Sequence, residues 1–529
     1  MQLEAIFMKK LQGTLIVTQK VGMMGIRHLS SAVEKETGVA PKLCFLAKDP
    51  AYSQYSEGEL GGIKKIVEND GWIGISASAL ALGRVRQIIG MLKAELPGIP
   101  IFVGGVQAVM TPEMFLDMGA DAVCRQEGEI WLPEALRMLA SGQTIPRNFE
   151  TAAPIHNLVP PPDYDYSQGT HYVLKSGFVR LITTSEAEFS AAGNFSFSDL
   201  EADGTKGRMG ARFPLWQFTQ RRCKSRCTYC CNYKFAQFDK VHGGPPERLT
   251  TENVILQVSE TIAKNSIIDF VIFFDDDFFE RFRAGNSVDK GELEAFCKGW
   301  KSQVRRPFFT YFRPTTFDVE IFESLVDAGL RQVTFGFQTA SPETLRIYGR
   351  RQPGSSDILG ITSILSKAVK EGKIDTPDID LLINSPFESA TDIRRTIEAL
   401  LSFTPPFDTQ MHNMHLFPGY GITEMFEAGR ATPLPGFRIV LDREYQDHCG
   451  HSDWIWANLE DDKAYFTLLQ MLMTGVCDER MLGVLERKDM QAWLALAPAE
   501  RKTRESELRA LFDSNPRIKY YEGMDGESK

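Results

Sequence analysis

The sequence lacks the features of a membrane-spanning or secreted protein. None of its apolar runs reaches the roughly eighteen residues that a membrane helix needs. The first ten residues contain Glu4 and no small-residue cleavage pattern, so they do not resemble a secretion signal. The nine cysteines are scattered except for one cluster, which argues against a disulfide framework and predicts a reducing, cytoplasmic location.

Excess positive charge is also missing. Lys and Arg number 59 against 69 Asp and Glu, so the net charge of -10 gives no electrostatic reason to expect a nucleic-acid partner. No G-x-x-x-x-G-K-[ST] sequence occurs, and no repeat of solenoid period is found. The composition, 43% hydrophobic and 24% charged, is that of an ordinary globular chain, and 529 residues suit two or three domains.

The most informative segment is a cysteine-rich run at 221–232, which reads R-R-C-K-S-R-C-T-Y-C-C-N. Cys223, Cys227 and Cys230 are separated by three and then two residues. A loop this short can direct three thiolates at three corners of a [4Fe-4S] cube, whose fourth iron stays open to a substrate or cofactor. The spacing therefore predicts a cluster that serves as a reaction centre.

A structural zinc site is the alternative for these thiols. Zinc normally takes four protein ligands, and here only Cys231 or the distant His242 can complete the set. The spacing favours the cluster, with Cys231 as a bystander. With Tyr229 before the third cysteine, the run resembles that of the radical S-adenosylmethionine (SAM) superfamily, and the resemblance implies that SAM chelates the open iron through its amine and carboxylate.

The N-terminal residues 1–145 predict a doubly wound α/β domain. Short apolar runs alternate with helical periodicity, as in a parallel sheet. We expect strands at 14–18, 43–47, 72–76, 101–103 and 120–124, and a helix between the third and fourth that ends at the Pro97 to Pro100 turn. In such a domain ligands bind beyond the carboxyl ends of the strands.

Polar and glycine-rich stretches follow three of these strands. They begin at Gly22, Gly104 and Glu127, and together they resemble the cobalamin-binding domain that precedes many radical SAM cores. The resemblance implies a corrin site that includes Gly22, Gly25, Ser76, Gly104, Gly105, Gln107 and Glu127. Glycines let backbone lie against a flat macrocycle, although each could instead simply make a tight turn. The Asp-x-His-x-x-Gly motif is absent at 19–22, which leaves open a vacant lower cobalt face or a domain that binds no corrin.

A boundary and a second α/β unit follow. Residues 146–212 are rich in chain breakers such as Pro160 to Pro162 and predict a linker or insertion. From 213 to 425 strands and helices alternate again, which suits six β/α units, a partial TIM-like barrel with its chemistry at the carboxyl ends of the strands. Residues 426–529 predict a C-terminal helical domain, for instance a helix at 464–474.

The family resemblance also implies contacts for SAM at the strand ends of this barrel, namely Asp275, Asp276, Arg313, Gln338, Arg350, Asn384 and Pro418. The acids at 275–277 could instead cap a helix or hold Mg²⁺. Thr339 and Ser385 depart from the usual serine and glycine of the family. The sixth strand is expected at 412–417, where His415 is a candidate proton donor or acceptor near the substrate.

The resemblance implies a cobalamin-dependent radical SAM enzyme of the class B methyltransferase type. A 5′-deoxyadenosyl radical would activate an unreactive carbon of a small-molecule or natural-product substrate, and cobalamin would deliver a methyl group. Flavodoxin or ferredoxin is the expected electron donor. Three alternatives remain: a non-methylating cyclisation, rearrangement or oxidation; a radical SAM enzyme with a vestigial cobalamin domain; and a non-enzymatic metal scaffold.

Overall fold

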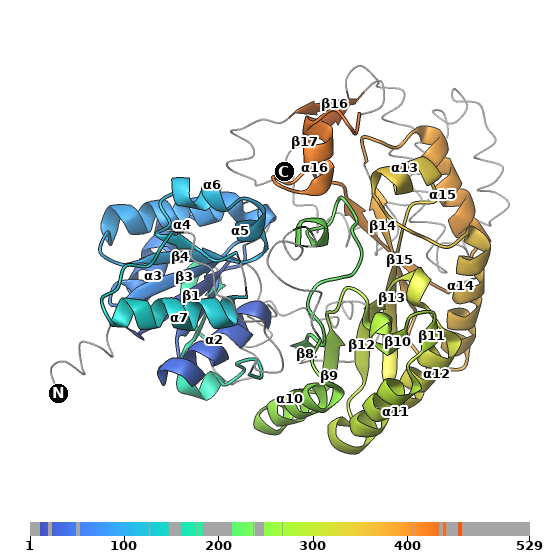
Figure 1. Cartoon of the computed structure of the whole chain (residues 1–529), viewed down its shortest axis with the longest axis horizontal. Coiled ribbons are helices and arrows are strands. Elements are labelled where there is room, and N and C mark those ends of the chain that lie inside the picture. Colours follow the sequence, from blue (N-terminus) through green and yellow to red (C-terminus); the bar gives the residue numbers. More distant parts are fainter. Residues whose placement is uncertain are drawn as a thin grey trace.

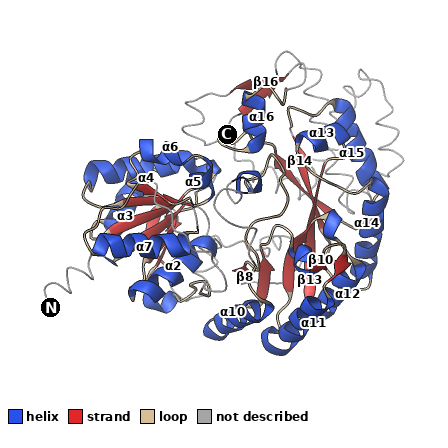
Figure 2. Cartoon of the chain, viewed as in Figure 1, coloured by secondary structure: helices blue, strands red, loops and turns tan. Residues whose placement is uncertain are grey.

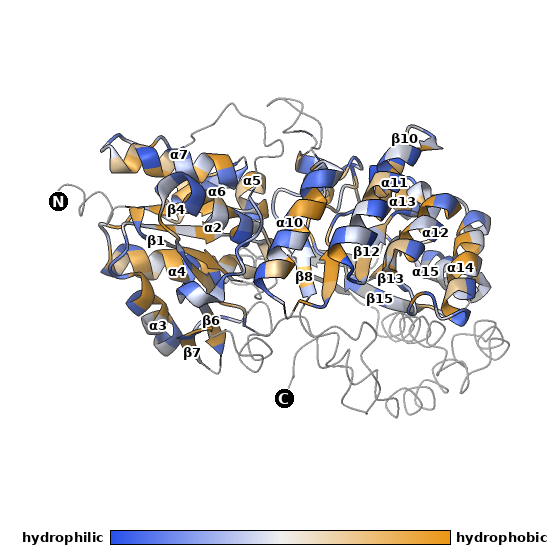
Figure 3. Cartoon of the chain, turned by 90° about the horizontal axis from the view of Figure 1, so that it is seen from below, coloured by the Kyte–Doolittle hydropathy of each residue, from blue (hydrophilic) through white to orange (hydrophobic). Residues whose placement is uncertain are grey.

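The computed structural model contains two α/β units that lie beside each other (Figure 1). Their sheets are flanked by helices, and the strands of both are largely apolar (Figures 2 and 3). Among the described residues no helix has the length and apolar character needed to cross a bilayer. The structure describes residues 11–18, 24–48, 53–125, 127–147, 160–175, 177–182, 214–235, 237, 248–266, 268–383, 385–404, 406–432, 437–440 and 453–456.

The N-terminal unit is built on a sheet with the order β5-β4-β3-β1-β2-β6-β7. Every pair in it is parallel except β6 with β7, and Leu15 of β1 stands between Leu43 of β2 and Gly74 of β3. The order reverses at β1, which is the expected doubly wound pattern. The strands are β1 Gly13–Val17, β2 Lys42–Phe45, β3 Trp72–Ser76, β4 Ile101–Gly104, β5 Ala122–Val123, β6 His171–Lys175 and β7 Phe178–Leu181.

Helices cover both faces of this sheet because successive strand residues point to opposite sides. Leu15 packs in one buried cluster with Val33 and Trp131 of α2 and α7, whereas Ile16 packs in another with Ile63 and Ile88 of α3 and α4. The helices are α2 Met24–Thr37, α3 Glu57–Val67, α4 Leu82–Glu95, α5 Val106–Met110, α6 Pro112–Asp117 and α7 Gly128–Ala140.

Strands β6 and β7 differ from the expectation, because they come from the segment that the sequence assigned to a linker. Leu43 of β2 pairs with His171 of β6, so the chain returns to the first sheet after its proline-rich run. Arg27 on α2 holds that run: its guanidinium lies 4.0 Å from the Tyr164 ring and donates to Tyr166 Oη at 2.9 Å. The His171–Lys175 strand was not predicted because chain-breaking residues surround its sequence.

The second unit is a six-stranded, all-parallel sheet with the order β15-β14-β13-β12-β9-β8. This confirms the partial (β/α)6 barrel. Its strands are β8 Pro214–Gln217, β9 Phe270–Phe273, β12 Phe308–Phe312, β13 Leu330–Gln338, β14 Asp378–Ile383 and β15 Asp408–Asn413. Its helices are α10 Thr251–Lys264, α11 Lys290–Gly299, α12 Val319–Ala328, α13 Pro342–Ile347, α14 Ser355–Lys370, α15 Ala390–Ser402 and α16 Gly421–Glu427. Single turns and a small hairpin complete it, at η4 Phe278–Phe282, β10 Arg283–Ala284, β11 Ser287–Val288, η5 Trp300–Val304 and η6 Pro314–Thr316.

Two further expectations need correction. The sixth strand runs over Asp408–Asn413, four residues earlier than predicted, so His415 lies in the turn after it. Met414 and Leu416 pack in a buried cluster with Tyr348 and Ile422, and their apolar spacing resembles that of a strand. In the C-terminal region the described residues form an antiparallel pair, β16 Phe437–Val440 with β17 Asp453–Trp456, where helices were expected. The helix expected at 464–474 lies outside the described residues.

Candidate functional site

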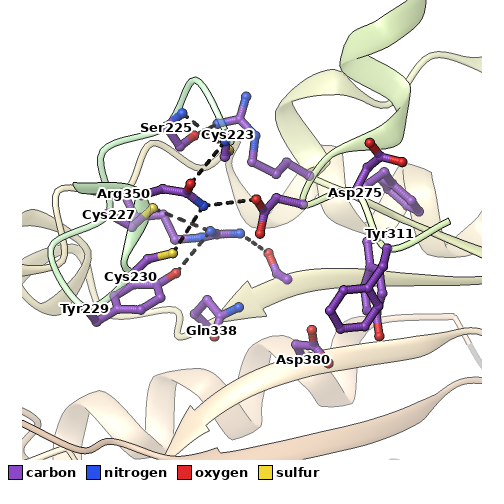
Figure 4. Close-up of a pocket in the computed structure, with 16 residues that line it drawn as sticks. Cys223, Ser225, Cys227, Tyr229, Cys230, Asp275, Tyr311, Gln338, Arg350 and Asp380 are labelled. Atoms are coloured by element: carbon purple, nitrogen blue, oxygen red, sulfur yellow. Dashed lines mark hydrogen bonds between the residues drawn. The ribbon is translucent and has the colours of Figure 1, made fainter. Parts of the chain in front are cut away.

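The three cysteines of the motif line one pocket at the carboxyl end of the barrel strands (Figure 4). Cys223 and Cys227 are buried and Cys230 is half-buried. They lie in the loop that follows β8, as the sequence predicted, while Cys231 is not among the pocket-lining residues. The pocket thus gathers three thiols from one short loop.

Backbone contacts from two other segments hold this loop. Thr228 N–H donates to Tyr348 O, and Ile422 N–H donates to Thr228 O, each at 2.8 Å. Arg222, next to the first cysteine, has a φ of 69°, so the chain turns sharply there at the expense of some strain. The loop is therefore fixed by α13 and α16, far away in the sequence.

The chemistry of the donor set fits a cluster. Burial raises the pKa of the Cys223 thiol to about 12, and a hydrogen bond with Cys231 together with burial raises the pKa of Cys230. Iron binds thiolates, so it would displace these protons. In the described part of the chain no three His, Cys, Asp or Glu side chains form a group that could hold a single metal ion. A cube differs, since each thiolate binds its own iron.

Asn232, which the sequence reasoning missed, organises the thiols. Its Oδ1 accepts from the Cys223 N–H at 3.2 Å, and its Nδ2 lies 3.5 Å from Cys230 Sγ. The same Nδ2 donates to Asp276 Oδ2 at 3.0 Å. One amide thereby joins the cysteine loop to the end of β9.

The three aspartates after β9 have different surroundings. Asp275 is buried and accepts from the N–H groups of Thr219 and Gln220, at 3.0 and 2.6 Å, and burial raises its pKa to about 7. This carboxyl group pins the end of β8. Asp276 is exposed toward the pocket, although the protein around it desolvates its carboxylate and raises its pKa. Asp276 is therefore better placed than Asp275 to bind a ligand.

Asp277 and Arg313 form an ion pair behind the pocket. Arg313 Nε donates to Asp277 Oδ2 at 2.7 Å, and Thr316 Oγ1 donates to the other oxygen at 2.7 Å. Arg313 also donates to Ser225 Oγ in the cysteine loop. The structure thus gives Arg313, predicted as a SAM contact, a bracing role between β12 and the loop, and it still lines the pocket.

Gln338 ends β13, and Arg350, which follows α13, contacts the same strand. Gln338 has a φ of 66°, and the register with β14 shifts between Gly336 and Gln338. Arg350 donates to Gly336 O and to Tyr229 Oη, the latter at 3.2 Å, and its Nη1 lies 3.9 Å from Cys227 Sγ. A Cβ at Gly336 would lie 2.6 Å from Gln338 Nε2, so glycine permits this close packing.

These side chains surround a cavity of about 300 Å³. It extends from the cysteines past Gln338 to Tyr311 and Asp380, which lie on the side away from the thiols (Figure 4). Acidic, amide and guanidinium groups next to three thiols are the donor set that SAM at an iron corner would need. Of the predicted SAM contacts, the cavity is lined by Asp275, Asp276, Arg313, Gln338 and Arg350.

The remaining predicted barrel residues lie elsewhere. Pro418 is in the turn after β15 and Asn384 lies outside the described residues. His415 is half-buried, its ring lies tilted at 5.4 Å from that of Phe417, and it is absent from the cavity lining. Its predicted catalytic role has no support from this geometry.

At the carboxyl edge of the first sheet, three buried polar atoms have no hydrogen-bond partner: Thr18 Oγ1, Ser78 Oγ and Gln107 Oε1. They follow β1, β3 and β4, so they meet at one edge, where a doubly wound sheet binds ligands. Buried polar atoms are normally satisfied, and a ligand rich in amides, such as cobalamin, fits that edge. Sequence reasoning found Gln107 but missed Thr18 and Ser78, each of which lies just past a strand end.

The glycines there act in different ways. Gly105 has a φ of 91°, and a Cβ on it would lie 2.8 Å from Ala77 O, so it is needed for the turn itself. A Cβ on Gly104 would meet only Cys124 Cβ at 3.6 Å, and Gly25 has open space around it. Gly22 lies outside the described residues. Ser76 sits half-buried at the end of β3.

The two units meet at the mouth of the barrel. Gln107 Nε2 donates to Pro418 O at 2.9 Å, and Gly419, with a φ of 79°, leaves no room for a Cβ beside Met110 O. The carboxyl edge of the N-terminal sheet therefore adjoins the carboxyl end of the barrel. Pro418, predicted to contact SAM, forms part of this junction.

An ion-pair cluster ties the first unit to the cysteine loop. Arg221 pairs with Glu127 at 2.5 Å and with Glu129, and Arg222 pairs with Glu127 at 2.9 Å. Nearby, burial and Arg221 lower the pKa of His28 to about 4. Glu127, expected at the corrin, thus pairs with the cysteine loop, as does Glu129 of the same stretch.

Comparison with known proteins agrees with this architecture. The family model of the B12 binding domain matches residues 63–136, and that of the radical SAM superfamily matches 218–400. Over 422 residues the chain is 23% identical to the uncharacterized methyltransferase PH0819 of Pyrococcus horikoshii, covering 78% of this chain and 79% of that protein.

Two solved structures share the fold. The radical SAM methyltransferase TsrM from Kitasatospora setae, with cobalamin and a [4Fe-4S] cluster bound, gives a TM-score of 0.58 at 14% identity over 89% of each chain. The cobalamin-dependent radical enzyme OxsB, with aqua-cobalamin bound, gives 0.56 at 15% identity over 95% of this chain and 72% of the other.

The family models fall on the two units that the structure shows. A radical SAM domain implies a [4Fe-4S] cluster and SAM, and a B12-binding domain implies cobalamin, so the three expected cofactors are confirmed at the level of the family. The zinc-scaffold alternative is thereby set aside. This chain is a radical SAM enzyme that carries a B12-binding domain ahead of its catalytic barrel.

Proposed function

We propose that this enzyme is a cobalamin-dependent methyltransferase that adds a methyl group to an unactivated carbon of a small-molecule substrate. The observation that carries the proposal is the junction at Gln107 and Pro418, since it brings the corrin edge of one unit to the mouth of the other. Methyl transfer needs a donor within reach of the activated carbon. The names of PH0819 and TsrM, both methyltransferases, support the same reaction.

The residues of the cavity would hold the cofactors and the substrate. Cys223, Cys227 and Cys230 would hold the cluster, while Asp276 and Gln338 would orient SAM beside it. When bound, the three cofactors would supply the electron, the radical and the methyl group. The chain itself would bind and orient the substrate in the cavity of the barrel and exclude water from it.

A reductant must deliver electrons to the cysteine loop. A flavodoxin or ferredoxin is the donor class that we propose, and the cytoplasm is the compartment in which such donors and free thiols persist. Lys224 in the loop is exposed over 62% of its side-chain surface and pairs with Glu280 at 2.6 Å, so a donor that docks there would meet a charge pair.

The test uses anaerobically reconstituted enzyme with cobalamin, reductant and SAM labelled in its methyl group. We expect 5′-deoxyadenosine to form and the label to appear in the product. Turnover without label in the product would contradict methylation and favour a cyclisation, rearrangement or oxidation. Full activity without cobalamin would instead favour a vestigial N-terminal domain.

A further inference from the structure

The part of the cavity away from the thiols has one aromatic side. Phe274, which follows β9, and Tyr311 of β12 line it. Trp216, Phe218 and Phe309 pack against these two rings, and the five together are called the aromatic wall. Phe274 is the centre of this wall: its ring lies 5.3 Å from Trp216 and 5.6 Å from Tyr311, and 43% of its surface is exposed. An apolar ring left open inside a cavity points to an apolar ligand group.

The side chain of Asp380, on β14, lies near Tyr311 in the same part of the cavity (Figure 4). Its Oδ1 is buried and makes no hydrogen bond, although the imidazole of His412 forms an ion pair with it at 3.6 Å. One step deeper in the same strand, Asp378 accepts a hydrogen bond from Gln332 Nε2 at 3.0 Å. The deeper acid accepts a hydrogen bond, whereas the acid that lines the cavity has only the ion pair with His412.

The nearest cationic group to Asp380 is the imidazole of His412, whose pKa Asp380 raises, and the two arginines of the cavity are engaged elsewhere. Arg313 is paired with Asp277, and Arg350 is held by Gly336 O and Tyr229. Asp380 is half-buried, and its Oδ1 accepts no hydrogen bond in spite of the ion pair with His412, so its place in a cavity favours a hydrogen-bond donor that arrives with the ligand. A protonated nitrogen satisfies the carboxylate and is also attracted to the faces of aromatic rings.

We propose that the substrate is an amine with an apolar or aromatic body, whose protonated nitrogen binds Asp380 while the body packs against the aromatic wall. The inference rests on the proposed function, in that this cavity receives the substrate. Asp380 is then the residue that selects cationic over neutral and anionic compounds. The competing occupant is SAM itself, which is also a cation.

The test measures equilibrium binding to reconstituted enzyme with cobalamin and SAM but no reductant. The probes are 1-naphthylmethylamine, 1-naphthylmethanol and 1-naphthoate, at about pH 8, above the usual pKa of histidine and below that of an alkylamine. We expect the amine to bind about tenfold more tightly than the alcohol, with the carboxylate weakest. In Asp380→Asn this preference falls to within about threefold, while Phe274→Ala weakens all three probes and keeps the preference.

The matched control is Asp327→Asn, because Asp327 is exposed over 74% of its side chain and lies outside the cavity. Equal binding of amine and alcohol to the wild type, or a preference that survives in Asp380→Asn, overturns the proposal. A loss of SAM affinity in Asp380→Asn with unchanged probe preference assigns the acid to SAM and also overturns it. Failure of methyl transfer with the amine preference intact would count against the proposed function alone.

Discussion

At the scale of single residues, the adjacent thiols of Cys230 and Cys231 differ in their position relative to the cavity. Cys230 lines the cavity and Cys231 does not, although the two thiols interact. Adjacent side chains in a turn point in different directions, so one loop cannot present both to the same cube. The contrast between them gives a direct test of the cluster.

We expect Cys230→Ala to lose most of its iron and Cys231→Ala to keep about four irons per chain. The measurement is iron and sulfide content after anaerobic reconstitution, with the visible absorbance of the cluster as a second readout. The same iron loss in both variants would contradict the assignment of the three ligands.

Glu388 is a second residue with an unusual environment. It is buried, with Thr339 Oγ1 donating to it at 2.5 Å, and burial raises its pKa to about 8. Between about 4.5, its ordinary value, and about 8, the folded protein holds a proton that the unfolded chain releases. The free energy of unfolding therefore falls as pH rises through this window.

Glu388→Gln should remove this pH dependence of the free energy of unfolding, since glutamine mimics the protonated acid. We expect the variant to lose less thermal stability than the wild type between pH 5 and pH 8, roughly the window of linkage. Glu343→Gln serves as control because Glu343 is exposed. The prediction fails if both variants follow the wild-type pH profile.

At the scale of elements, the β4–α5 turn tests how the corrin edge is built. Gly105→Ala forces a Cβ against Ala77 at a positive φ and should destabilise the N-terminal unit by about 1–3 kcal/mol. Gly104→Ala meets only ordinary contact distances, so it should change stability by less than about 0.5 kcal/mol.

The readouts are anaerobic thermal unfolding and cobalamin affinity. If the corrin lies against this turn, Gly104→Ala should weaken cobalamin binding without changing the stability of the N-terminal unit. Equal stability losses in the two variants would contradict the role given to the left-handed Gly105.

The sequence predicted the elements that combine a clear period with clear breakers. Strands Trp72–Ser76 and Phe308–Phe312 were placed to the residue, and the order of units along the chain was right. His171–Lys175 was missed because its pairing with β2 joins residues more than 120 positions apart. The turn at 414–417 was misread because burial by side-chain packing carries the same apolar signal as a strand.

The site divides in the same way. The thiols were predictable, since one short loop carries all three. Asp380, Asn232 and Glu129 were not, because their importance comes from atoms contributed by other strands and by the other unit. Sequence spacing reports neighbours within a loop, and it is silent on what lies across a cavity.

At the scale of the whole molecule, the ion pairs of Arg221 join the two units. Glu129 is nearly buried, so Arg221→Met would leave an unpaired acid and should cost about 3 kcal/mol. Adding Glu129→Gln to that variant should recover part of the loss. Thermal unfolding of the reconstituted enzyme is the measurement, and a single variant as stable as the wild type would contradict the cluster's role.

The tight fit of Gly419 on Met110 has a consequence for how the enzyme is assembled. A corrin held at the carboxyl edge of the N-terminal sheet would be enclosed by the barrel once the halves close. Cobalamin should then enter during maturation and remain through many catalytic cycles. Radiolabelled vitamin added to the finished enzyme should exchange far more slowly than SAM turns over, and rapid exchange would show that the halves part during each cycle.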